Sequence, residues 1–347
     1  MKIAYIVPSL ASKAPIAVCK MLADYFSSLG HEVIVYYFDE IKEITFLCPV
    51  KKIKFNDDID FDYYDIIHSH CRRPDIYLAK RKKKIKKAKI ISTIHCDIIE
   101  DLSWIYGKVI ASIFGKKWIN ALKRFDVTVE LNPFLMEKYN YFQKNVLIPN
   151  GIEIFTDETD KHKIIMNKIE KLKQQNFIVL VSFSVIIRRK GLDQVIKFLE
   201  INPTFCFICI GSGPYKYKLQ KMVNDKALGE RVFFYESIPR PYLVLREADL
   251  FIFPSYSEGQ GLTLLEAGYM NCPVVCSDIP AFRVFSENEV TFFKPKNIES
   301  LSNSINQALL LRNKVSQLRK KLNELYTISV MRKKYESLYF SLINIIV

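Results

Sequence analysis

"ADLFIFPSYSEGQGLTLLEA", residues 248–267, joins an apolar run to a helical pattern through a loop that contains two glycines. The apolar run from Asp249 to Phe253 predicts a buried strand. Gly259 and Gly261 permit backbone conformations and close approaches that other residues resist. A helix is predicted to start near Thr263. Because ligands of doubly wound sheets bind beyond the carboxyl ends of strands, we expect this loop to line a binding site.

Two carboxylates flank this loop. If Glu258 and Glu266 shared one helix, they would lie about 12 Å apart along its axis, which exceeds the roughly 5–9.5 Å between the paired carboxylates of a glycoside hydrolase. We therefore place Glu258 in the loop and Glu266 in the helix, with the amides of Gly261, Leu262 and Thr263 forming an anion site between them. A ligand with hydroxyls at both ends and phosphate in the middle is a nucleotide sugar. Alternatively, either glutamate alone complements the helix dipole.

The order of strand and helix recurs along the whole chain. The first half predicts strands at 2–7, 31–38, 64–70, 90–94, 125–132 and 144–150, and helices at 15–30 and 74–87. The second half predicts strands at 177–184, 204–211, 232–236, 249–255 and 271–277, and helices at 191–200, 215–229 and 240–248. Near-continuous apolar strands between helices indicate parallel sheets covered on both faces. We predict an α/β protein with two doubly wound Rossmann-like domains that face each other across a cleft.

A polar, turn-rich segment, residues 148–163, separates the two series. We predict an amino-terminal domain at 1–155 and a carboxyl-terminal domain at 156–325. Aromatic and aliphatic residues at helical spacing in 326–347 predict a final helix that packs back toward the first domain.

The composition favours anionic partners. The net charge is +14, which suits phosphorylated substrates or anionic lipid, and no nucleic-acid-binding motif accompanies it. The eight cysteines include a CxxC at Cys206 and Cys209, whose side chains fall on opposite faces of a strand. We interpret all eight as reduced thiols of a cytoplasmic protein. The first residues form a strand rather than a signal peptide, and no run approaches the length of a membrane span.

The segment from Arg72 to Lys89 contains ten cations and one acid, Asp75. Its basic residues, alongside Ile76, Tyr77, Leu78 and Ile85, predict contact with an anionic membrane surface. The predicted contact residues are Arg72, Arg73, Lys80, Arg81, Lys82, Lys83, Lys84, Lys86 and Lys87. The alternative is a charged helix exposed to water. His68 and His70 alternate along one strand, but no third ligand is evident, so we predict no metal site.

Motifs in a fixed order resemble family 4 glycosyltransferases of the GT-B fold. In the second half they are KG before a helix, IGSGP, the stretch at 248–267 and CPVVCSD; in the first half they are GHEVIVYYF, DIIHSH, STIHCD and VLIPNG. The resemblance spans roughly residues 1–295 and includes that family's Glu-x7-Glu donor signature. It implies sugar transfer with retention from a UDP or GDP sugar, without a cofactor or metal.

The resemblance also implies roles for individual residues. Glu258, His95 and Lys190 would be catalytic, with Glu258 holding the sugar hydroxyls and His95 facing the transferred sugar. The donor site would comprise Arg188, Arg189, Lys190, Gly211, Gly213, Glu258, Gly259, Gly261, Leu262, Thr263 and Glu266, of which Glu266 would bind the ribose and Lys190 the diphosphate. Cations at a strand end can neutralise such a leaving group, although a solvated basic turn is the alternative.

The sequence departs from the family at several positions. Ser184 and Val185 occupy the place of the usual Gly-Arg, which leaves Arg188 or Arg189 to supply the cation. The loop after the first strand has no glycine, so Ser12 and Lys13 would contact the acceptor. Asn271 stands where glycine is common, and Asn tolerates the left-handed conformation that such a position requires.

We therefore predict a hexosyltransferase that is peripheral on the inner face of the cell membrane. Its acceptor would be a lipid-linked saccharide in the biosynthesis of lipopolysaccharide O-antigen or capsule. The departures keep two alternatives open: an inactive relative that binds a saccharide or partner enzyme, and a nucleotide-sugar epimerase on the same fold.

Overall fold

The computed structural model describes residues 1–311 and 314–343, and the chain divides into two compact units. Unit 1 comprises Met1–Gly151 together with Ile328–Val347, and unit 2 comprises Ile152–Thr327. The first division lies within the polar segment that the sequence marks as a boundary. The terminal segment groups with unit 1 although unit 2 precedes it in the chain.

Unit 1 contains a seven-stranded parallel sheet in the order β3-β2-β1-β4-β5-β6-β7. Its strands are β1 (Lys2–Leu10), β2 (Glu32–Lys42), β3 (Val50–Lys52), β4 (Ile66–His70), β5 (Lys89–Ile94), β6 (Val127–Glu130) and β7 (Asn145–Leu147). β1 and β4, at the centre, are buried along most of their length, as expected for strands covered on both faces.

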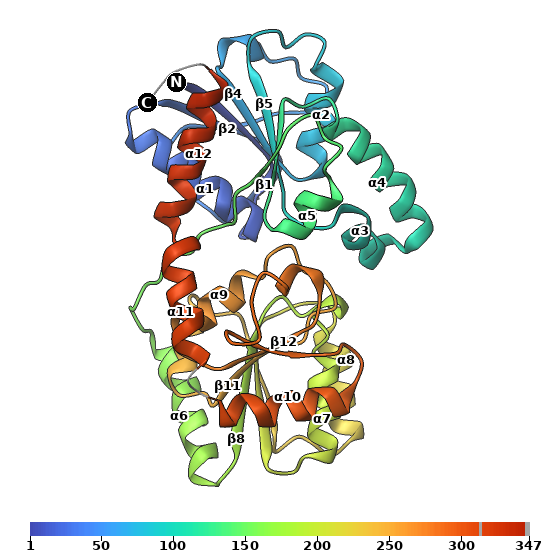
Figure 1. Cartoon of the computed structure of the whole chain (residues 1–347), viewed down its shortest axis with the longest axis vertical. Helices are drawn as coiled ribbons and strands as arrows, with labels where there is room; N and C mark the ends of the chain where they lie inside the picture. Colours follow the sequence, from blue (N-terminus) through green and yellow to red (C-terminus); the bar gives the residue numbers. More distant parts are fainter. Residues whose placement is uncertain (312–313, 344–347) are drawn as a thin grey trace. The chain divides into compact units, whose positions relative to one another are not determined.

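Helices cover both faces of this sheet (Figure 1). They are α1 (Ala14–Ser28), α2 (Arg72–Arg81), α3 (Ile98–Tyr106), α4 (Lys108–Leu122), α5 (Pro133–Lys138) and α12 (Ile328–Leu342), with the 3-10 helix η1 (Phe61–Tyr63). α1 and α12 share one hydrophobic cluster, in which the rings of Phe26 and Tyr339 stack 4.8 Å apart. Side chains from α2, α3, α4 and α5 form the cluster on the opposite face.

Unit 2 contains a six-stranded parallel sheet in the order β10-β9-β8-β11-β12-β13. Its strands are β8 (Ile178–Phe183), β9 (Phe205–Ile210), β10 (Val232–Tyr235), β11 (Leu250–Phe253), β12 (Val274–Ser277) and β13 (Thr291–Phe293). The helices are α6 (Asp160–Gln174), α7 (Asp193–Ile201), α8 (Lys216–Asp225), α9 (Leu262–Tyr269), α10 (Ile298–Leu310) and α11 (Lys314–Leu325). Three 3-10 helices, η2 (Arg188–Lys190), η3 (Pro241–Arg246) and η4 (Pro280–Phe282), complete the unit.

Strands β8, β9 and β11 are neighbours in this sheet, and this adjacency positions the site. The strands are parallel, so their carboxyl ends meet at one edge. The loops that follow them carry the motifs RRKG, IGSGP and PSYSEGQG.

Two predicted elements differ in the structure. The helix expected at 74–87 is α2, which ends at Arg81, and a turn follows. The helix expected at 240–248 is the 3-10 helix η3, which begins at Pro241. Helices of this type are short and have a tighter hydrogen-bond pattern.

Within residues 1–311 and 314–343, no helix combines the length and apolar character that crossing a membrane requires.

Candidate active site

The loops after β8 and β11 are joined by close backbone contacts. Gly191 adopts a left-handed conformation with φ of 63°, and a Cβ at this position would clash with the carbonyl oxygen of Pro254. Gln194 donates from Nε2 to the same oxygen at 2.8 Å. The glycine of the KG motif is therefore required by packing, because any larger residue would push the two loops apart.

Glu258 lies between the two loops and is paired with cations. Its Oε1 atom lies 2.6 Å from Nζ of Lys190 and accepts a hydrogen bond from Oγ of Ser255 at 2.6 Å. Nη1 of Arg189 lies 3.9 Å from its Oε2 atom. Only 8% of the Glu258 side chain is exposed.

These neighbours determine the charge of Glu258. Burial alone would raise the pKa of this carboxyl, but the charges of Lys190 and Arg189, with hydrogen bonds from Lys190 and Ser255, outweigh it and lower the pKa. Glu258 is therefore an ionised hydrogen-bond acceptor at neutral pH.

The two arginines of the RRKG motif differ in environment. Nη1 of Arg189 donates to the carbonyl oxygen of Ser257 at 2.7 Å, and the Arg189 carbonyl accepts from the amide of Tyr256 at 2.8 Å. Arg188 is exposed. Arg189 is thus fixed against the loop that carries Glu258, whereas Arg188 extends into solvent.

Helix α9 begins at Leu262, after Gly261. Gly261 has φ of 81°, and a Cβ there would lie 2.6 Å from the ring of Phe282 and 2.8 Å from that of Phe253. Glycine is needed at this position both for its conformation and for its closeness to the two rings. The first N–H groups of any helix lack partners within it, so those of α9 form a site of positive potential. The Oγ1 atom of Thr263 is buried here without a hydrogen-bond partner among the described residues.

Glu266 lies in α9, in the turn after these amides. It is half-buried, and desolvation raises its pKa to about 8. Glu258 and Glu266 thus differ in charge state at neutral pH, because only Glu258 has cations beside it. The loop-and-helix arrangement predicted for the two glutamates matches the positions of both residues.

Gly211 and Gly213 follow β9 and contact the backbone after β8. A Cβ at Gly211 would clash with the carbonyl oxygen of Ser184, and one at Gly213 with that of Ile186. Both glycines have positive φ, of 150° and 157°. Close packing between two strand-end loops therefore explains their presence, independently of any contact with a donor.

In unit 1, His95 follows β5 and pairs with His70 at the end of β4. Nδ1 of His70 lies 2.9 Å from Nε2 of His95. His70 is fully buried, and its Nε2 atom has no hydrogen-bond partner among the described residues. Buried N–H groups are rarely left unpaired, so we assign the His70 proton to Nδ1, which donates to His95.

This assignment fixes the state of His95. Desolvation lowers the pKa of His95 to about 3, so its ring is neutral at pH 7. Because Nε2 accepts from His70, the single proton of His95 is on Nδ1. His95 therefore offers one N–H donor at the carboxyl edge of the unit 1 sheet.

His68, two residues before His70, has a structural role. Its Nδ1 atom lies 2.6 Å from the hydroxyl of Tyr339 in α12, and its Nε2 atom lies 2.8 Å from Oγ1 of Thr93. Oγ1 of Thr93 also lies 2.8 Å from the hydroxyl of Tyr335, which is a second side chain of α12. Across residues 1–311 and 314–343, no group of three or more His, Cys, Asp or Glu is arranged to hold a metal ion.

Ser12 and Lys13 form the short loop between β1 and α1, and both are exposed. The amide of Ser12 donates to Oε2 of Glu43 at 2.8 Å. Lys13 occupies the N-cap of α1. The two residues thus lie at the carboxyl edge of the unit 1 sheet, where β4 and β5 also end.

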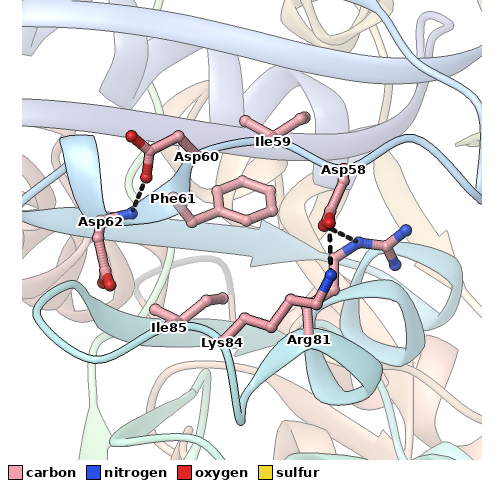
Figure 2. A pocket seen from close by; sticks show the side chains of 8 residues that line it. All are labelled: Asp58, Ile59, Asp60, Phe61, Asp62, Arg81, Lys84 and Ile85. Carbon is pink, nitrogen blue, oxygen red and sulfur yellow. Dashed lines mark hydrogen bonds and ion pairs between the residues drawn. The ribbon is translucent and has the colours of Figure 1, made fainter.

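The prediction that the apolar residues of the segment 72–89 contact a membrane is wrong. Tyr77, Leu78 and Ile85 belong to the core of unit 1, because α2 and the turn after it turn their apolar side toward the sheet. Figure 2 shows the pocket beside this segment, where Asp58 pairs with both Arg81 and Lys84.

Most of the other cations that were predicted to contact the membrane also interact with side chains of the protein. The partners are Asp39 for Arg73, Asp126 for Lys82, the Phe114 ring for Arg72 and the Phe55 ring for Lys80. The pocket in Figure 2 adds Asp60 and Asp62 to Asp58, so its lining contains three aspartates and two cations. Lys83, Lys86 and Lys87 are exposed. This segment therefore offers less free positive charge than its sequence suggests.

Three residues of the site were not identified from the sequence. Ser255 binds Glu258, Gln194 links two loops and His70 pairs with His95. The sequence signal for His70 was its place at the end of a strand next to the one that His95 follows.

Comparison with known proteins identifies the family. The family model described as "Glycosyl transferases group 1" matches residues 163–324. The chain is 32% identical to the O-antigen biosynthesis glycosyltransferase WclY of Escherichia coli, over 99% of each chain. The chain belongs to the group 1 glycosyltransferases.

Other similar proteins are more distant in sequence. The processive diacylglycerol alpha-glucosyltransferase of Acholeplasma laidlawii is 24% identical over 64% of this chain and 68% of its own length. The crystal structure of Anabaena HepE in complex with UDP superposes with a TM-score of 0.83 at 16% identity, covering 98% of this chain and all of HepE. This likeness, with the two parallel sheets, shows that the glycosyltransferase has the GT-B fold.

Proposed function

We propose that this glycosyltransferase transfers a hexosyl unit, with retention of configuration, from a UDP or GDP sugar to a saccharide acceptor. The observation that carries the proposal is the arrangement around Glu258. An ionised carboxylate, two fixed cations and the N-terminus of α9 follow neighbouring strands of unit 2. Together they match a ligand that presents hydroxyls beside a diphosphate.

Each group has a proposed role in the donor site. Glu258 accepts hydrogen bonds from sugar hydroxyls, while Lys190 and Arg189 neutralise the diphosphate with the help of the amides of Gly261, Leu262 and Thr263. Glu266 accepts hydrogen bonds from the ribose. Arg188, Gly211, Gly213 and Gly259 shape the edges of this site.

In the proposed reaction, the bond between the anomeric carbon and the diphosphate oxygen breaks. The acceptor hydroxyl forms its new bond on the same face, and its proton passes to the departing diphosphate. Cations and helix amides lower the energy of this step because negative charge develops on the leaving group. His95 would hold the transferred sugar through its Nδ1–H group, and the reaction takes no cofactor.

We further propose a role in surface polysaccharide biosynthesis with a lipid-linked acceptor that contacts Ser12 and Lys13. The name of the Escherichia coli relative supports a polysaccharide product, and that of the Acholeplasma laidlawii relative supports a lipid acceptor. The enzyme would then work in the cytoplasm, at the inner face of the cell membrane.

The first test is thermal stabilisation of the purified chain by UDP, GDP, ADP, CMP and their sugar conjugates, without added metal. A ligand that binds only the folded state raises its stability by mass action, so a selective shift identifies the nucleotide. Glu258→Ala and Glu266→Ala should remove this shift and the transfer activity. Full transfer activity in both variants would refute the proposal.

The absence of the family's usual Gly-Arg at Ser184 and Val185 favours one second candidate, an inactive relative that binds a saccharide. Nucleotide binding without turnover on any acceptor would support it. A product formed from the donor alone would instead indicate an epimerase.

A further inference from the structure

Two tyrosines of α12 lie against the strands that carry His70 and lead to His95. Tyr335 and Tyr339 are fully buried and belong to the hydrophobic cluster that α12 shares with the unit 1 sheet. Their rings supply apolar surface to this cluster, and phenylalanine in either place would supply the same surface. A buried hydroxyl costs free energy unless it finds a hydrogen-bond partner. The two hydroxyl groups therefore call for an explanation other than core packing.

Both hydroxyls lead to His68. The hydroxyl of Tyr339 lies 2.6 Å from Nδ1 of His68. The hydroxyl of Tyr335 lies 2.8 Å from Oγ1 of Thr93, which in turn lies 2.8 Å from Nε2 of His68. Burial lowers the pKa of His68 to about 3, so its ring is neutral at pH 7 and one nitrogen donates while the other accepts. The ring of His68 is thus held at both nitrogens, and each connection ends at α12.

His68 in turn supports the ring of His70. The two rings stack with their centroids 4.4 Å apart and 29° between their planes. The ring of Tyr5 also stacks on His70, at the larger centroid distance of 6.4 Å. Nδ1 of His70 is bonded to His95, but its Nε2 atom has no hydrogen-bond partner among the described residues. The orientation of the His70 ring away from His95 therefore depends on ring stacking, and His68 offers the closer surface.

We propose that Tyr335 and Tyr339 are positioning residues for His95. They fix His68, His68 supports His70, and His70 donates to Nε2 of His95, which leaves the Nδ1–H group of His95 as the donor toward the substrate. A donor stabilises a transition state most when it is oriented before the reaction. This inference rests on the proposed function in one respect, that His95 contacts the transferred sugar.

The alternative is that the hydroxyls only fasten α12 to the rest of unit 1. The chain offers a matched control for this alternative. The hydroxyl of Tyr25 in α1 donates to Oε2 of Glu336 in α12 at 3.1 Å, and both residues are half-buried. Tyr25→Phe therefore removes a tyrosine hydrogen bond that attaches α12 and leaves His68 with its partners.

The test compares Tyr339→Phe, Tyr335→Phe/Tyr339→Phe and Thr93→Val with Tyr25→Phe, all in the full chain. Thr93→Val interrupts the network from β5 and leaves α12 unaltered, so it decides the matter if an α12 variant folds poorly. Long-range ¹H–¹⁵N NMR of ¹⁵N-labelled histidine is the first measurement. The three network variants should shift the signals of His70 and His95, and the double variant should add a second His95 tautomer. Tyr25→Phe should leave these signals in place.

Transfer kinetics with the donor found by thermal stabilisation are the second measurement. Tyr339→Phe should lower kcat about fivefold and the double variant roughly tenfold, because the net contribution of a hydrogen bond corresponds to factors of this size. KM for the donor and the thermal shift with nucleotide should stay unchanged, since the proposed nucleotide-binding groups belong to unit 2. Tyr25→Phe should retain kcat.

Two results would overturn the proposal. One is a His95 spectrum that stays unchanged in the network variants, whatever happens to their melting temperature. The other is a Tyr25→Phe variant that shifts His95 and lowers kcat as much as Tyr339→Phe does, because any loosening of α12 would then suffice. Failure of the proposed function has a different signature: shifted His95 signals in the network variants, with no transfer by the unaltered chain, would contradict the transferase and leave the positioning role intact.

Discussion

Nucleotide affinity should rise with pH through the ionisation of Glu266. Burial raises the pKa of this carboxyl to about 8, whereas the carboxylate accepts hydrogen bonds from ribose hydroxyls more strongly than the neutral carboxyl does. Nucleotide binding is therefore expected to favour the form of the site that has lost this proton. With a pKa of about 8, the ionised fraction is about 3% at pH 6.5 and about 75% at pH 8.5, because each pH unit changes the ratio tenfold.

The expected gain in affinity over these two pH units is up to about 25-fold. Isothermal titration of the nucleotide identified by thermal stabilisation measures it directly. Glu266→Gln is the matched control, because glutamine keeps the shape of the side chain and does not titrate. The diphosphate and the base also ionise, but they do so equally with both proteins. If the affinities of the two proteins change in parallel with pH, Glu266 does not bind the nucleotide as a carboxylate.

The stability of the protein without nucleotide provides a second test of the raised pKa of Glu266. The folded pKa of Glu266 is raised above its unfolded value, so the folded state binds more protons in the window between them. The free energy of unfolding therefore falls as pH rises toward 8, by about 1 kcal/mol between pH 6.5 and pH 7.5. Chemical denaturation should show this loss in the unaltered chain relative to Glu266→Gln. An equal slope in both would mean that the pKa is not raised.

Three further outcomes are expected. Glu258→Gln and Lys190→Met should each destabilise the fold by about 3 kcal/mol, because each leaves a buried charge without its partner, and the double variant should lose less than the sum in chemical denaturation. Gly213→Ala should abolish the thermal shift with nucleotide, since its methyl group would displace a neighbouring backbone carbonyl. His70→Asn should keep an N–H donor near the position of Nδ1 and retain kcat within a few-fold. His70→Gln should lower kcat more than tenfold and move the proton of His95, which long-range ¹H–¹⁵N NMR detects. Equal kcat and equal spectra in the two variants would contradict the assigned tautomer.

The sheets could be predicted from the sequence because their strands are apolar along most of their length. β8 and β9 are buried at nearly every position, so each appears as a continuous apolar run between helical patterns. Gly259 and Gly261, after β11, were recognised as special from their residue type, whereas Gly211 and Gly213, after β9, entered through the family resemblance. Their physical reason required the structure, since the carbonyl oxygens that exclude a Cβ at Gly211 and Gly213 belong to residues before the α7 helix.

Helices α3 and α4 could not be predicted from periodicity. A surface helix is recognised by apolar residues on one face and polar residues on the other. Between Ile98 and Leu122 the inner face is apolar, and Val109 and Ile113 make the outer face apolar too.

Contacts between side chains that are far apart in the sequence could not be predicted either. Lys190 and Glu258 are 68 residues apart and meet because β8 and β11 are neighbours in the sheet. The sequence placed both residues at strand ends but did not give the strand order. In the segment 72–87, charge counting failed for a related reason, because Asp58, the partner of Arg81 and Lys84, lies outside it.

The order of strands also bears on which cation takes the place of the missing family arginine. Ser184 and Val185 follow β8 directly and carry no charge, so a cation must come from the turn after them. Arg188 and Arg189 are adjacent in that turn, but only Arg189 is held, by the carbonyl oxygen of Ser257, and only Arg189 lies within 4 Å of the Glu258 carboxylate. A leaving group is stabilised most by a charge that is already in position when the bond breaks, because no energy is then spent on ordering it. Arg189 meets that condition, and an exposed Arg188 would have to be ordered by the donor itself.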